Sequence, residues 1–117
     1  MKILLVTFAG SGLLLILIAL PLIKRRIKPN PWYGFRVRAT LENPDVWYDV
    51  NAHMGRRLLI GGLITTLAAV LLFLIPDLSP DMYAIACGGI SVFAISLGLM
   101  QTVRYLKNRT PRPPTQF

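Results

Sequence analysis

Three stretches of this chain contain no Asp, Glu, Lys, Arg or His: residues 3–23, 58–75 and 82–103. At 1.5 Å per residue, helices of these lengths run roughly 27 to 33 Å, which is about the thickness of the hydrocarbon core of a bilayer. The first stretch is too long for the apolar region of a signal peptide and is followed by no small-x-small cleavage site. The sequence therefore predicts a single all-α membrane domain with three transmembrane helices.

The basic residues are gathered in two segments outside these stretches. Of the 13 Lys and Arg that give a net charge of +8, eight lie in the loop 24–57 and four in the tail 104–117, whereas the connector 76–81 has none. The positive-inside rule predicts a cytoplasmic loop and tail, with the N-terminus outside. Because topology and anionic lipid head groups account for the charge, we expect the lipid bilayer as a partner and no nucleic acid.

The loop contains the start of a helix at Asn43-Pro44-Asp45. Asn is a good N-cap, Pro is favoured at the first helical position, and Asp suits the positive end of the helix dipole. An apolar face follows at a 3.6-residue period, made of Val46, Trp47, Val50 and Met54. We predict a short amphipathic cytoplasmic helix that turns or runs directly into the second span at Leu58.

Small residues recur along one face of each of the last two spans. The second span carries Gly61, Thr65 and Ala69, and the third carries Ala84, Gly88, Ser91, Ala94 and Gly98. Close backbone approach at small residues is a main route to helix association in membranes. Since the short connector makes these spans antiparallel, we predict that the two stripes face each other; the alternative is that a stripe receives a helix of another protein.

Two further segments are candidates for docking a partner. If the last two spans pair with each other, much of the first span is left for an external helix, and its small polar cluster is Gly10, Ser11 and Gly12. The tail is rich in proline and predicted to be extended, with Pro111, Pro113 and Pro114 as its candidate contact residues.

Residues for catalysis or cofactor binding are not evident. No span contains an ionisable side chain, and His53, which we expect to pair with Asp49 on the surface, is the only histidine. A single histidine with no nearby cysteine excludes a bis-histidine haem site and a structural zinc site. We therefore expect no enzymatic activity, metal or cofactor, and a bound lipid is the one small ligand left open.

A run of residues in the loop resembles the signature of the SdpI family of bacterial membrane proteins. The matching residues are Asn30, Tyr33, Gly34, Phe35, Arg36, Thr40, Trp47, Asn51 and Gly55. The resemblance covers the whole loop and the three-span layout, and it implies a bacterial inner-membrane protein. The family takes its name from an immunity protein that protects a bacterium from its own secreted toxin, but immunity members are longer and carry additional spans.

The loop residues also have interpretations of their own. Gly34 suggests a turn with positive φ, and Asn51 is suited to satisfying loop backbone groups. The guanidinium of Arg36 can bind a carboxylate such as Asp45 or Asp49, or a lipid phosphate. The loop is therefore either a folded cytoplasmic cap or a site for a ligand or partner.

From these features we expect a non-enzymatic accessory or stabilising subunit that docks on a larger bacterial membrane complex. Respiratory and photosynthetic complexes are natural hosts for such subunits, although nothing in the sequence selects one. The alternative is an immunity or signalling protein of the SdpI type, which confers resistance to a membrane-active peptide toxin.

Overall fold

The computed structural model describes residues 1–117 except 31, 33 and 110–117, together with all side chains in that part but those of residues 39 and 109. Four helices follow one another: α1 (Lys2–Ile23), α2 (Arg38–Glu42), α3 (Pro44–Phe73) and α4 (Pro80–Arg109). The described part contains no β-strand. The prediction of an all-α chain is confirmed, and Pro111, Pro113, Pro114 and Tyr33 lie outside the described residues.

The two longest helices begin at side chains that cap them. The Asn43 side chain accepts hydrogen bonds from the backbone N–H groups of Asp45 and Val46, and Pro44 occupies the first turn of α3. In the same way the Ser79 hydroxyl accepts from Met82 N–H, with Pro80 at the start of α4. These caps satisfy donors that a helix N-terminus leaves without partners. The helix start predicted at Asn43 is confirmed.

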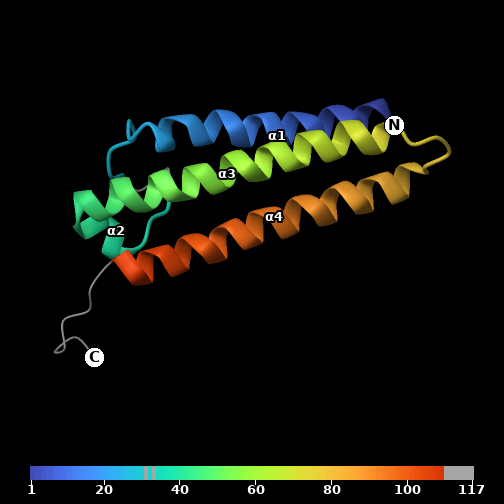
Figure 1. The fold of residues 1–117 in the computed structure, drawn as a ribbon. Helices are drawn as coiled ribbons and strands as arrows, with labels where there is room; N and C mark the ends of the chain where they lie inside the picture. Colours follow the sequence, from blue (N-terminus) through green and yellow to red (C-terminus); the bar gives the residue numbers. More distant parts are fainter. Residues whose placement is uncertain (31, 33, 110–117) are drawn as a thin grey trace.

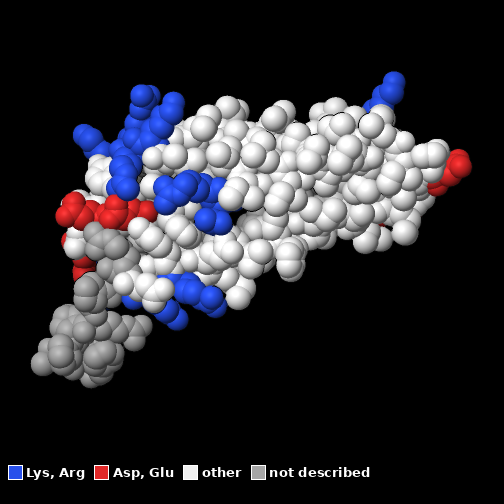
Figure 2. Space-filling model, in the orientation of Figure 1, with Lys and Arg blue, Asp and Glu red and all other residues white. Residues whose placement is uncertain are grey.

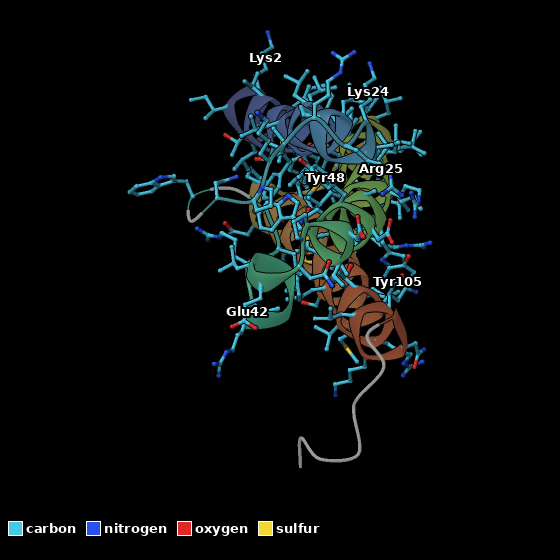
Figure 3. The ribbon with its side chains drawn as sticks, turned by 90° about the vertical axis from the view of Figure 1, so that its left-hand side faces the viewer. Lys2, Lys24, Arg25, Glu42, Tyr48 and Tyr105 are labelled. Atoms are coloured by element: carbon cyan, nitrogen blue, oxygen red, sulfur yellow. The ribbon has the colours of Figure 1, made fainter. Side chains whose placement is uncertain are left out.

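The three long helices lie in a row, with α3 between α1 and α4 (Figures 1 and 3). The molecule measures 60 × 28 × 18 Å, so it is flatter than a closed bundle. Each long helix is long and apolar enough to cross a membrane. The three predicted spans are therefore present, and the helices that contain them extend further at their ends.

The predicted amphipathic helix is not confirmed as an element of its own; of the two arrangements expected, the segment runs directly into the second span. Residues 44–57 are instead the first turns of α3, which continues without a break to Phe73. In the described part of the loop, the only other helix is the five-residue α2. The reason is that the stretch from Asn43 onward contains no residue able to end a helix, since Gly55 is tolerated within one.

Helix α1 packs closely on α3 through glycine. A Cβ atom placed on Gly12 would lie 2.7 Å from the Gly62 carbonyl oxygen, and one on Gly62 would lie 2.6 Å from the Gly12 carbonyl oxygen. Gly55 makes a similar approach to Ala19 near the other end of α1. The expectation that Gly12 is free for an external helix is therefore wrong, because α3 occupies that position.

Helices α3 and α4 are joined by side-chain contacts near each of their ends. Near the connector, the buried Tyr83 hydroxyl donates to the Ala69 carbonyl oxygen at 2.8 Å, and Phe8 and Phe73 contact its ring edge to face. Near the loop, His53 of α3 stacks on Tyr105 of α4 with ring centroids 4.4 Å apart. The pairing of α3 with α4 thus depends on aromatic side chains at its ends.

The two stripes of small residues face each other only in part. Ala69 contacts α4, and Gly98 receives the side chain of Arg57. In contrast, Gly61 and Gly88 have no other atom within 4 Å of the position that a Cβ would take. The stripe therefore does not bring the two backbones together at its centre.

Charged side chains lie at the two ends of the molecule, and the surface between them in this view has no Lys, Arg, Asp or Glu (Figure 2). Many large apolar side chains of the three long helices are exposed. Basic side chains gather at the end that holds the loop and the end of α4, and the acidic residues of the connector lie at the opposite end. This distribution matches a helix bundle whose middle lies in lipid and whose ends lie in the head-group layers.

The adjacent glycines of α3 provide a matched test of this packing. Gly62→Ala should lower the free energy of unfolding by about 1 to 3 kcal/mol, because the new methyl group overpacks against the Gly12 carbonyl and Ile16. Gly61→Ala introduces the same methyl group into open space and should not destabilise the protein. Unfolding in mixed micelles, followed by circular dichroism, measures both; equal losses of stability would contradict the close approach.

Candidate functional site in the connecting loop

The loop between α1 and α3 folds onto the first turns of α3, and its contacts centre on Asn51. The Asn51 Oδ1 atom accepts a hydrogen bond from Phe35 N–H at 2.5 Å. Its Nδ2 group donates to the carbonyl oxygens of Phe35, at 3.4 Å, and Trp47, at 3.0 Å. The buried side-chain amide of Asn51 thus pairs with both the N–H and the C=O of Phe35. It holds this loop residue through the same two backbone groups that a neighbouring β-strand would bind.

Gly34 lies directly against this amide. Its φ is +107°, and a Cβ atom there would lie 2.6 Å from Asn51 Oδ1 and 3.3 Å from the Trp47 ring. Both the backbone conformation and the space exclude a side chain. The turn with positive φ predicted at Gly34 is confirmed.

Trp47 is completely buried beneath the loop. Its indole Nε1–H donates to the Ile27 carbonyl oxygen at 2.8 Å, so the ring fixes the segment that leaves α1. Asn30 contributes to the same segment by accepting from Trp32 N–H and donating to the Lys28 carbonyl oxygen. The indole thus has the hydrogen-bond partner that a buried tryptophan requires.

Thr40 holds the segment on the other side of Asn51. Its buried hydroxyl accepts from Val37 N–H at 3.0 Å and lies 3.0 Å from the Phe35 carbonyl oxygen, to which it can donate. This closes the short helix α2 onto the loop. Four residues of the motif, Gly34, Thr40, Trp47 and Asn51, therefore act on one small region of backbone.

One ionic contact at the loop was not expected from the sequence. The carboxylate of Asp49 pairs with Arg25 at 2.6 Å. Both side chains are partly exposed, so this pair adds little stability. Arg36 is exposed. The partner of Asp49 was missed because Arg25 lies in a basic run that the sequence explains by topology alone.

His53, expected to pair with Asp49, instead contacts α4. Its Nδ1 atom lies 3.3 Å from the Thr102 hydroxyl, and its ring stacks on Tyr105. Burial lowers the pKa of His53, and the nearby Arg57 and Arg56 guanidinium groups lower it further. The imidazole is therefore neutral at pH 7, which suits its stacked position.

The remaining predicted residues serve packing or lie on the surface. Gly55 allows α1 to approach α3, and Gly10 and Ser11 face outward from α1. Among the described residues, no three His, Cys, Asp or Glu side chains are close enough to hold a metal ion together. The loop is thus a cap held by hydrogen bonds to its backbone, with the side chains of Thr40, Trp47 and Asn51 directed inward.

The fold and the cap define a small membrane protein made of three long apolar helices and a folded loop. The family model of the SdpI/YfhL protein family matches residues 26–102, which is well over half of the chain and includes the cap. The chain belongs to this family. Neither the search of curated proteins nor the search of solved structures found a match.

The two tryptophans of the chain provide a test of the cap. Trp47→Ala should destabilise the protein by about 3 kcal/mol, because it removes a buried ring and leaves the Ile27 carbonyl without its donor. Trp32, which is 85% exposed, is the matched control and should tolerate alanine. Thermal melting in detergent compares the two, and a Trp47 variant as stable as wild type would show that the ring does not support the cap.

Proposed function

We propose that this protein is a non-enzymatic accessory or stabilising subunit that docks on a larger bacterial membrane complex. The observation that carries the proposal is the open row of helices. Helix α4 contacts α3 on one side, and its other sides expose large apolar side chains, including Ile85 and Val92. Such an edge helix offers a long surface to the helix of another subunit.

The cap supports the same proposal by what its residues do. The active site of an enzyme would need polar side chains directed toward a substrate, whereas Asn51 and Thr40 are directed at the chain's own backbone. We infer that the motif of the loop maintains a rigid structure at one membrane surface. Trp32 is exposed on this structure, and an exposed ring of this kind suits the head-group layer or a partner subunit.

The second candidate is immunity of the SdpI type, which membership of the family favours. In that case the cap or the exposed helices would bind a membrane-active peptide or a signalling partner. A deletion strain separates the two candidates. Loss of assembly or yield of a membrane complex supports the accessory role, and sensitivity to a secreted toxin supports immunity.

The docking surface can be tested with two glycines that both have open space around them. Gly88→Leu on α4 should reduce co-purification of the host complex with the tagged protein in mild detergent by tenfold or more, because the larger side chain separates the helices. Gly10→Leu on α1 is the matched control and should leave co-purification unchanged. Equal recovery of the complex with both variants would exclude the edge of α4 as the docking surface.

We further propose that the protein lies in the bacterial inner membrane with its N-terminus outside and its loop and C-terminus in the cytoplasm. The basic end of the molecule supports this orientation through the positive-inside rule. In a Cys87→Ala background, a cysteine introduced at Ser79 should react with a membrane-impermeant thiol reagent from the periplasmic side. A cysteine introduced at Trp32 should react only after the membrane is opened, and the reverse pattern would overturn the orientation.

A further inference from the structure

A groove runs between α3 and α4 on the side where their backbones are apart. It has a volume of about 380 Å³, within the range of roughly 300 to 1,000 Å³ typical of small-ligand sites. Gly61 and Gly89 form part of its wall, and neither would have an atom within 4 Å of an added Cβ. The groove therefore exists because these two positions carry no side chain.

The groove is polar at one end and apolar along the rest. Arg57 and Gln101 lie at the end nearest the loop, and Ile64, Ile90 and Phe93 line the deeper part. Along α4 it extends from Gly89 to Gln101, which is roughly 18 Å of helix and comparable to one leaflet of a hydrocarbon core about 30 Å thick. Its length and polarity thus follow those of a single lipid.

Arg57 carries a charge that the described part of the chain does not neutralise. Its Nε atom is buried without a hydrogen-bond partner, and no described carboxylate forms an ion pair with it. The first atoms of its side chain pack against the backbone of α4 at Gly98, where an added Cβ would lie 3.0 Å from Arg57 Cβ. A half-buried guanidinium whose Nε–H is buried without a partner requires an acceptor, and an anion satisfies it best.

We propose that this groove binds a phospholipid, with one acyl chain against Ile64, Ile90 and Phe93 and the phosphate on Arg57. A phosphate presents acceptor oxygens that match the planar fork of arginine, and basic sites between transmembrane helices bind anionic head groups. Arg57 directly precedes the charge-free stretch that begins at Leu58, so its guanidinium lies at the depth of the head groups.

A partner helix fits this groove less well than a lipid does. A helix is about 10 Å wide with its side chains and would rest on the rim, whereas an acyl chain is narrower and can enter. The backbone carbonyls of a transmembrane helix are already paired within the helix, so an apolar helix offers no acceptor to Arg57. The site is separate from the proposed docking surface at Gly88 and does not depend on the identity of a partner complex.

The test compares two lipids by native mass spectrometry of the delipidated protein in detergent. Phosphatidylglycerol should bind about tenfold or more tightly than a diacylglycerol with the same chains, which is the scale of a hydrogen bond to a charged group. Arg57→Gln should remove this preference. Arg56→Gln, which removes the same charge at the adjacent exposed position, is the matched control and should retain it. Equal loss in both variants would mean diffuse surface attraction and would overturn the proposal.

The position of the acyl chain is tested separately. Gly89→Leu should fill the groove and weaken binding of both lipids by tenfold or more, and unchanged binding in the folded variant would overturn the proposal. A phosphatidylglycerol with a photoactivatable group in its acyl chain, bound to the wild-type protein, requires no variant. It should label residues 89–101 and 60–64, and labelling confined to α1 would show that the chain lies elsewhere.

Discussion

The contact of backbone with backbone between α1 and α3 is the constraint on which the rest of the structure depends. In a bilayer, apolar side chains gain little by leaving lipid for one another, so helices associate where their main chains come close. Gly12 and Gly62 provide that approach in the middle of the pair, and Gly55 provides it near the loop. With α1 and α3 fixed at these points, the ends of the connecting loop are fixed as well.

The loop is then held by hydrogen bonds to its backbone and by few apolar contacts. Asn51 and Trp47 both lie in the first turns of α3, and together they fix the segments around Phe35 and Ile27. Their positions depend on α3 continuing through the loop end of the molecule as one helix. A separate surface helix at residues 44–57 would move independently of the spans, whereas the continuous helix ties the cap rigidly to them.

Features set by local chemistry were predictable from the sequence, and features set by the choice of partner were not. The lengths of the stretches without charged residues predicted the three spans. Asn43 predicted the start of α3, and Gly34 predicted the turn with positive φ in the loop. The predicted pairing of the second and third spans is present, but the closer contact of α1 with α3 was missed, since Gly61 and Gly62 are adjacent and point about 100° apart on a helix. The four-residue spacing selected Gly61, which faces the groove, and the tightly packed Gly62 was missed. Only the neighbouring helix distinguishes the two positions.

The looser contact between α3 and α4 has a consequence for function. Aromatic contacts join the two helices near both ends and Arg57 packs against Gly98, whereas Gly61 and Gly89 have open space beside them. The resulting space must be filled, because apolar surfaces in a membrane exclude water and are covered by lipid or protein. Because Arg57 lies beside the groove, its positive charge favours a lipid with an anionic head group. In the sequence, the feature that indicates a role for Arg57 is its position directly before the charge-free stretch that begins at Leu58. A basic side chain at that position fits the positive-inside rule and can also bind a lipid head group.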